Sequence, residues 1–151
     1  MERVHASTVA MDGLAVLIRG PSGAGKSDLA LRLLDAGAEL IADDYTDIRR
    51  DGESLIASAP ASIAGRLEIR GLGILAMTHR AEAPLGLCLD LVPREAVERL
   101  PEPDYVSLQD VTLPRLKLDA FSASTPAKVK RALALLAQGD SLWPDEREAR
   151  S

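Results

Sequence analysis

The feature that most constrains this fold is a glycine-rich segment between an apolar run and a helical pattern. Its residues are Gly20, Pro21, Ser22, Gly23, Ala24, Gly25, Lys26 and Ser27. Phosphate oxygens need several N–H donors in a small volume, and a glycine-rich turn before a helix N-terminus provides them. The segment matches G-x-x-x-x-G-K-[ST], in which the lysine contacts the β- and γ-phosphates and the hydroxyl coordinates Mg²⁺. We therefore predict a phosphate loop; the alternative is a turn that only connects two elements.

Strong secondary-structure signals lie on both sides of this loop. Residues 4–10 and 14–18 suit strands, and the Asp12-Gly13 dipeptide between them favours a tight turn. After the loop, leucine and alanine recur at helical spacing over 26–36, and Gly37 follows where a helix end favours a left-handed residue. We expect a hairpin, the phosphate loop and a helix, in that order.

The rest of the chain mixes strand and helix signals, which predicts an α/β fold with a mixed β-sheet and flanking helices. We expect strands at 39–42, 45–49, 54–58, 85–91 and 111–118, a helical stretch at 94–99, and a last helix opened by Ser124-Thr125-Pro126, whose hydroxyls cap free amides. Residues 59–73 suit an exposed strand or a mobile loop. We predict one catalytic domain over 1–139 and a polar tail over 140–151.

The composition narrows the class of partner. Of the 151 residues, 46% are hydrophobic, and the formal net charge is −5. With one Trp, two Tyr and one Phe, base stacking offers little for single-stranded nucleic acid. The longest apolar runs fall far short of the roughly 18 residues of a membrane span. The single cysteine, Cys88, lies among apolar residues, which predicts a buried side chain and fits a reducing cytoplasm. We expect a cytoplasmic protein that binds neither nucleic acid nor membrane.

Two adjacent carboxylates, Asp43 and Asp44, follow the apolar run 39–42 soon after the phosphate loop. In phosphoryl transfer, one carboxylate typically holds the metal and another accepts the proton of the attacking hydroxyl. Alone, such a pair at a strand end is more often a solvated turn, but its closeness to a complete phosphate loop favours catalysis. Asp90 ends another apolar run and is the weaker candidate for the metal.

Three other side chains are candidate site residues only if the fold brings them close to the phosphate loop and the acidic pair. His5 lies in the first strand, where a lone histidine is more often structural than catalytic. Glu68 and Arg70 alternate with apolar residues, which suits an exposed strand with charges of both signs. In the functional interpretation, Arg70 stabilises the negative charge of a phosphoryl group, and Glu68 orients a metal ion or a protein partner.

Four segments together resemble the HPr kinase/phosphorylase family. They are His5-Ala6-Ser7-Thr8, residues 20–33 with the phosphate loop, Leu40-Ile41-Ala42-Asp43-Asp44, and Leu67-Glu68-Ile69-Arg70-Gly71-Leu72-Gly73-Ile74. The loop by itself is shared by many unrelated proteins. Its order and spacing with the other three segments is much more specific, and the match covers nearly the whole chain.

The resemblance implies a phosphate-loop kinase domain with a fold like that of phosphoenolpyruvate carboxykinase. The family phosphorylates a serine of HPr, a carrier protein of the phosphotransferase system, with ATP or pyrophosphate, and removes that phosphate by phosphorolysis. The resemblance makes Asp44 the base for the serine, supported by Asp43 and His5. It places Ser27, Glu68 and Asp43 around Mg²⁺, and Arg70 at the phosphoryl group or at the coupling of the two activities.

Two departures from the family's longer members bear on this expectation. Those members carry an additional N-terminal domain, so this chain looks like the short form found in some proteobacteria. They also carry a Gly-Arg-Asn segment near the last helices, where Arg115 or Lys117 is the candidate to replace the positive charge. The longer members assemble as hexamers, which suggests a homo-oligomer here. The kinase activity is therefore more firmly implied than the reverse reaction.

Two alternatives stay open on the residues alone. The loop Gly-Pro-Ser-Gly-Ala-Gly-Lys-Ser also resembles that of guanylate kinase, which would make the chain a small-molecule kinase. The chain is short for such an enzyme and has no stretch recognisable as a nucleotide-acceptor lid. The other alternative is a sensor that binds phosphate or nucleotide without transferring it.

Overall fold

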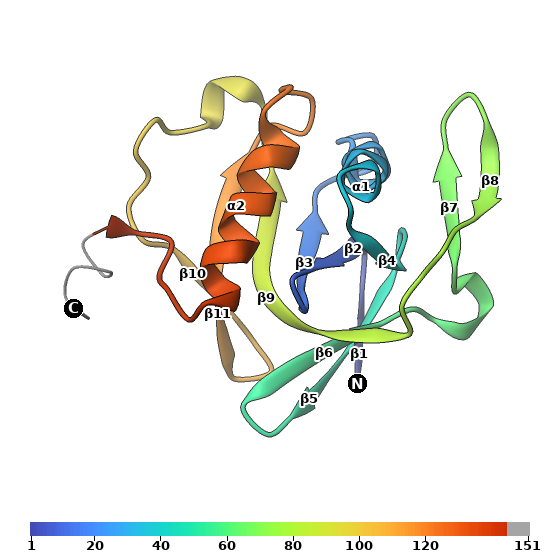
Figure 1. Ribbon diagram of the computed structural model, residues 1–151, viewed down its shortest axis with the longest axis horizontal. Coiled ribbons are helices and arrows are strands. Elements are labelled where there is room, and N and C mark those ends of the chain that lie inside the picture. The colour runs from blue at the N-terminus through green and yellow to red at the C-terminus, as the bar shows by residue number, and fades with distance from the viewer. Residues whose placement is uncertain (145–151) are drawn as a thin grey trace.

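The computed structural model describes residues 1–144, which form a nine-stranded mixed sheet, a separate two-stranded hairpin and two helices (Figure 1). The strands of the large sheet are β1 (Glu2–Val4), β2 (Ala6–Met11), β3 (Leu14–Arg19), β4 (Glu39–Ala42), β5 (Thr46–Asp51), β6 (Ser54–Ser58), β9 (Glu82–Leu91), β10 (Tyr105–Leu108) and β11 (Val111–Leu118). The hairpin is β7 (Arg66–Ile69) and β8 (Gly73–Ala76), and the helices are α1 (Lys26–Asp35) and α2 (Thr125–Ala137). The predicted α/β class with a mixed sheet is confirmed.

The long strand β9 joins the two parts of the large sheet. Its first residues pair antiparallel with β6, and the rest pairs parallel with β3 on one side and β11 on the other. Figure 1 shows β9 curving between the β1-β5-β6 ribbons and the strands under the helices. When a strand is paired on both sides and covered on both faces, its sequence is a nearly continuous run of apolar residues. Residues 85–91 of β9 form such a run.

The core lies on both faces of the sheet. On one face Val16 and Ile18 pack with Leu29 and Leu33 of α1 and with Leu133 of α2. The opposite face carries a second cluster that includes Leu17, Ile41, Ile48 and Leu55. α1 and α2 lie side by side on the first face (Figure 1). Neither helix of residues 1–144 is long and apolar enough to cross a membrane.

Several elements differ from those predicted. The expected strand 4–10 breaks at His5, because β1 pairs with β5 while β2 pairs with β3 and β4. The segment 59–73 contains β7, which turns into β8, and Leu67 of β7 is fully buried. The predicted helical stretch 94–99 is only a 3-10 turn, Arg94–Ala96, and β10 had no clear sequence signal. Short elements of this kind depend on tertiary pairing more than on local pattern.

The C-terminal part also departs from expectation. Ser124 precedes α2 but its side chain makes no capping hydrogen bond, and the Thr125 hydroxyl donates instead to the carbonyl of Asp119 at 2.5 Å. The start of the expected polar tail is packed, because Ser141 and Trp143 are buried and the Trp143 ring lies 5.3 Å from that of Tyr105. Residues 145–151 of that tail lie outside the described residues.

We expect Leu89→Ala to lower the free energy of unfolding by about 2–5 kcal/mol, because the side chain is fully buried and its loss leaves a cavity. The matched control is Leu100→Ala, at a leucine 81% exposed, which should change that free energy by no more than about 0.5 kcal/mol. Urea denaturation followed by circular dichroism measures both. Equal effects would contradict the placement of β9 in the core.

Cys88 offers a second test of the core. Burial raises the pKa of its thiol from the ordinary 9.0 to about 12. Because the thiolate is the reactive form, we expect no reaction with a thiol reagent at pH 8 in the folded protein and full reaction in urea. As pH rises from about 9 toward 12, the folded state should lose stability, since the unfolded thiol ionises first. Rapid labelling of the native protein at pH 8 would contradict the buried position.

Candidate active site

The strand order brings three sequence-distant segments to one edge of the sheet. β2 runs antiparallel to both β3 and β4, with Ala6 opposite Arg19 and Thr8 opposite Ala42. The beginning of β2 therefore lies beside the ends of β3 and β4. The phosphate loop leaves β3 at this edge, the Asp43-Asp44 pair leaves β4, and His5 precedes β2.

A cleft of about 790 Å³ lies over this edge. It is lined by the loop, the first turns of α1, the β7–β8 hairpin and a segment before α2. The residues on its walls are His5, Ser22, Gly23, Gly25, Lys26, Ser27, Asp28, Leu31, Asp44, Glu68, Ile69, Arg70, Gly71, Leu72, Gly73, Ile74 and Phe121. The four sequence segments that carried the family resemblance thus meet around one cavity.

Two glycines give the loop its shape. Gly23 and Gly25 have φ angles of 82° and 100°, in the left-handed region that side chains rarely adopt. At Gly25 a Cβ would also lie 2.8 Å from Cζ of Phe121 and 2.9 Å from Cβ of Ala120. Helix α1 begins at the next residue, so its free N–H groups and positive dipole end face the loop. This geometry suits an anion.

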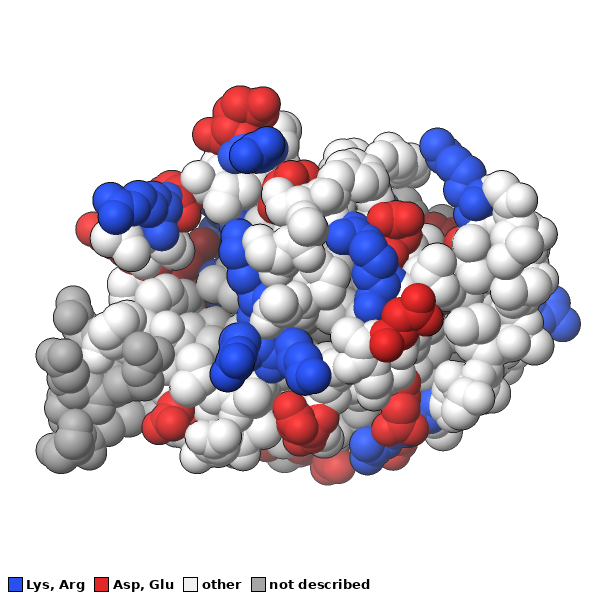
Figure 2. Space-filling model, turned by 45° about the horizontal axis from the view of Figure 1, so that its top comes forward, with Lys and Arg blue, Asp and Glu red and all other residues white. Residues whose placement is uncertain are grey.

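Lys26 is folded back over its own loop. Its ammonium donates hydrogen bonds to the carbonyls of Gly20 at 2.7 Å and Pro21 at 3.0 Å, and the residue is buried. An ammonium has three donors, so one remains for a ligand in the loop. Elsewhere, acidic and basic side chains are interspersed across the face drawn in Figure 2. On that face the structure offers no broad basic surface for an anion, whereas the loop offers amides and an ammonium.

Asp43 is a buried carboxylate shared by three elements. Its Oδ1 accepts hydrogen bonds from the hydroxyls of Ser7 at 2.8 Å and Ser27 at 2.7 Å. Its Oδ2 accepts from the backbone N–H of Glu68 at 3.1 Å. Asp43 thus holds β2, α1 and β7 together, and it fixes the hydroxyl of Ser27 at the start of the helix.

Asp44 occupies a strained turn at the rim of the cleft. Its φ is 70°, and the N–H of Tyr45 donates to the carbonyl of Asp43 at 2.8 Å, which closes a three-residue turn. One carboxylate oxygen lies 2.9 Å from Nε2 of His5, and the carboxylate side chain is 61% exposed. The His5 ring in turn packs on Tyr45, with ring centroids 5.2 Å apart. The carboxylate is oriented yet accessible, as a proton acceptor must be.

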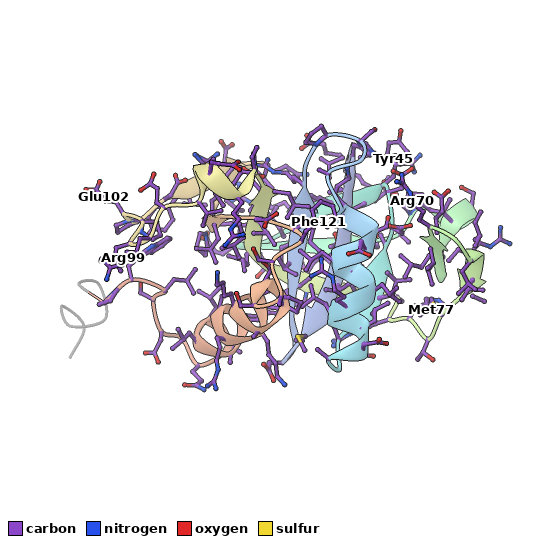
Figure 3. All side chains as sticks on the ribbon, turned by 90° about the horizontal axis from the view of Figure 1, so that it is seen from above. Tyr45, Arg70, Met77, Arg99, Glu102 and Phe121 are labelled. Carbon is purple, nitrogen blue, oxygen red and sulfur yellow. The ribbon has the colours of Figure 1, made fainter. Side chains whose placement is uncertain are left out.

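Glu68 and Arg70 reach the cleft from the β7–β8 hairpin, and both residues are exposed. Figure 3 shows Arg70 and Tyr45 on the same side of α1. Among residues 1–144, Arg70 has no ion-pair partner, so its charge is available to a ligand. The structure thus brings both residues to the same cavity as the phosphate loop, as their functional interpretation requires.

The donor set at the loop fits Mg²⁺. Ser27 Oγ and Asp43 Oδ1 are hard oxygen atoms 2.7 Å apart, and the Glu68 carboxylate lines the same cleft. Within residues 1–144 no group of three His, Cys, Asp or Glu side chains converges as a metal cage. Mg²⁺ normally takes only one or two protein carboxylates and completes its shell with phosphates and water. The few protein oxygen ligands at the loop are therefore enough for Mg²⁺, although no cage of three such side chains surrounds the site in residues 1–144.

Other candidates are not at this site. Asp90 pairs with Arg19, with contacts of 2.7 and 3.0 Å, and lies 3.6 Å from Arg115. Arg115 is also bonded to Asp104 at 2.8 Å, an interaction that lowers the pKa of that carboxyl. Neither Asp90, Arg115 nor Lys117 lines the cleft. The suggestion that Arg115 or Lys117 replaces the positive charge of the Gly-Arg-Asn segment stays a prediction, although neither side chain lines this cleft.

Sequence analysis missed three residues that shape the site. Ser7 links Asp43 to Asp44, because its hydroxyl also accepts the N–H of Asp44 at 3.2 Å. Phe121 lines the cleft and packs against Gly25, and Arg32 donates to the carbonyl of Ala120 beside it. Ser7 and Arg32 lay within segments already singled out. Phe121 had one signal, as the single phenylalanine of the chain.

The model of the HPr serine kinase C-terminal domain matches residues 1–129. The chain belongs to this family. It is 37% identical over 147 residues to an HPr kinase/phosphorylase of Geobacillus kaustophilus, covering 89% of this chain and 45% of that protein. An HPr kinase/phosphorylase of Lacticaseibacillus casei strain BL23 is 34% identical over 145 residues, covering 88% of this chain and 43% of that protein. The chain thus spans less than half the length of these relatives.

A solved structure of the Hpr(Ser) kinase/phosphatase from Coxiella burnetii has the same fold. Its TM-score to this HPr kinase C-terminal domain is 0.79 at 24% identity, and the match covers 91% of this chain and 97% of that one. At this level of identity the likeness shows the fold alone. It agrees with the large mixed sheet and the two helices of residues 1–144.

The loop geometry predicts unequal effects of two alanine substitutions. Gly23→Ala meets open space and costs only the strain of a left-handed alanine, about 1–3 kcal/mol. Gly25→Ala adds overlap with Phe121 and Ala120, so it should lower the free energy of unfolding further. Urea denaturation of the two variants measures the difference. Equal losses would contradict the close approach of Phe121 and Ala120 to Gly25.

Proposed function

We propose that this chain is a protein-serine kinase that phosphorylates HPr or a paralogous phosphocarrier, with ATP or pyrophosphate as donor and Mg²⁺ as cofactor. The family membership supports this class of reaction, and the relatives named above are HPr kinase/phosphorylases. The observation that carries the proposal is the position of Asp44. Its oriented, exposed carboxylate lies at the rim of the cleft that the phosphate loop opens into.

In this mechanism Asp44 accepts the proton of the carrier's serine hydroxyl as that oxygen attacks the terminal phosphorus of the donor. The bond between that phosphorus and the bridging oxygen breaks, and the remaining phosphate chain leaves. His5 holds the carboxylate from one side, while Ser7 holds the backbone N–H of the same residue. In the reverse direction, the protonated Asp44 returns its proton to the serine oxygen.

The other residues bind and neutralise the donor. The loop amides and Lys26 hold the phosphates, and Arg70 contacts the group in transfer. Ser27, Asp43 and Glu68 would hold Mg²⁺, which would supply positive charge to the donor phosphates. Asp43 is hydrogen-bonded to Ser7, Ser27 and the N–H of Glu68. These bonds hold the proposed ligands of Mg²⁺ at a fixed distance from Asp44, the proposed proton acceptor.

Phosphorolysis of the phosphoserine, a fold like that of phosphoenolpyruvate carboxykinase, and a homo-oligomeric assembly belong to the same proposal. Phosphorolysis needs only the reverse of the same steps, with inorganic phosphate as acceptor and pyrophosphate as product. Asp44 would then act as the acid, in the position that it already occupies as the base.

We expect Asp44→Asn to lower the rate of phosphate transfer from labelled ATP to HPr by about 10²–10⁴-fold, because the variant cannot accept the proton. ATP affinity should change by less than about threefold, since the phosphate loop is untouched. Asparagine tolerates the positive φ of this position, so the turn persists. Transfer is measured by label on HPr, and affinity by calorimetry.

The matched control is Asp12→Asn, an exposed aspartate with φ of 55° in the turn at the far end of β2, which should keep full transfer. Label on GMP instead of HPr would show the small-molecule kinase. Binding of ATP without transfer to either acceptor would show the sensor. An Asp44→Asn variant as active as the unmodified chain would exclude the proposed base.

A further inference from the structure

Phe121 is an exposed aromatic ring at the edge of the phosphate loop. It is 64% exposed, lines the cleft, and presents ring atoms to Gly25, whose added Cβ would lie 2.8 Å from Cζ. Apolar surface is costly in contact with water, and residues 1–144 leave most of this ring uncovered. Its position beside the loop therefore points to an apolar, flat ligand surface next to bound phosphate.

The backbone that carries Phe121 is held in place by several hydrogen bonds. One carboxylate oxygen of Asp119 accepts the Phe121 N–H at 3.1 Å, and the other accepts the Ser122 hydroxyl at 2.7 Å. These bonds, led by that of Ser122, lower the pKa of Asp119 and keep it ionised. Arg32 of α1 donates to the carbonyls of Ala120 and Ser122 and is itself held by Asp28. These hydrogen bonds thus fix the backbone of residues 119–122, which positions the Phe121 ring at the cleft.

The ring lies on the side of the loop away from the transfer chemistry. Figure 3 places Arg70 and Tyr45 on one side of α1 and Phe121 on the other. In Figure 1, α1 lies between α2 and β7, which agrees with contacts of α1 to both. In a triphosphate the terminal phosphate reacts, and the nucleoside is attached at the opposite end of the phosphate chain. With the terminal phosphate toward Asp44, the nucleoside emerges toward Phe121.

We infer that Phe121 is the platform on which the base of a nucleoside triphosphate donor stacks, with Arg32 as its positioning residue. The inference rests on the proposed function, because it concerns the phosphate donor of that reaction. It favours a nucleotide as the donor, since inorganic pyrophosphate has no base to stack on the ring. A base stacked on an aromatic side chain gains about 1–3 kcal/mol whichever base it is.

The test compares ATP with inorganic tripolyphosphate, which carries the same phosphate chain without a base. By calorimetry in the presence of Mg²⁺, Phe121→Ala should weaken ATP binding roughly tenfold and leave tripolyphosphate binding within about twofold. Phe121→Tyr should restore ATP affinity, and Leu100→Ala, remote from the cleft, should change neither. Arg32→Gln should weaken ATP selectively as well. Unchanged ATP binding, or equal loss for both ligands, would overturn the inference.

A second measurement does not depend on the alanine variant being well folded. In Phe121→Trp, ATP should quench the new indole fluorescence while tripolyphosphate should not, against the background of buried Trp143. Quenching by neither ligand would contradict stacking. Failure of the proposed function is separately visible: HPr would stay unlabelled with both ATP and pyrophosphate, while selective ATP binding through Phe121 persisted.

Discussion

The buried carboxylate of Asp43 is the contact on which the site depends. Taking an ion out of water costs several kcal/mol unless hydrogen bonds compensate for it, and each bond to a charged group returns about 1.5–3 kcal/mol. Asp43 receives three such bonds, from Ser7, Ser27 and the N–H of Glu68. Because the donors come from β2, α1 and β7, the same carboxylate fixes the relative positions of the strand that follows His5, the phosphate loop and the β7–β8 hairpin.

The sheet provides the frame for this network. β3 and β9 run parallel and are covered on both faces, so the loop after β3 starts from a rigid, buried strand. β2 runs the other way, which sets its first residues beside the ends of its neighbours. Catalytic side chains on loops are positioned well only when the strands beneath them are packed in this manner. The cleft thus forms where antiparallel pairing brings the start of β2 beside the ends of β3 and β4.

The two walls of the cleft differ in character. On the Asp44 side, charged and polar groups converge from His5, Glu68 and Arg70, which suits proton and phosphoryl transfer. On the other side, Phe121 offers an apolar ring held by Asp119 and Arg32. Under the proposed function, such a division would separate recognition of the donor from chemistry on its terminal phosphate. Residues of the predicted phosphate loop, among them Ser22 and Ser27, line the same cleft.

Much of this could be predicted from local pattern. The loop, the hairpin, the helix after the loop and the strand before Asp43 all follow rules of short range, namely residue spacing, turn dipeptides and positive φ at glycine. The pairing of β10, the break at His5 and the packing of Trp143 could not, because each depends on a partner distant in sequence. The same holds for the ion pairs of Asp90 with Arg19 and of Arg115 with Asp104, which join residues separated in sequence.

The sequence by itself determined that a glycine-rich loop leads into a helix with two carboxylates nearby, because backbone freedom and charge are local properties of the residues. Only the tertiary structure decided which carboxylate is buried and which faces the cleft. It also decided that Phe121, about a hundred residues beyond the loop, lies against Gly25. Those outcomes depend on strand order and on the docking of α2 beside α1, which bring together groups that no spacing along the chain relates.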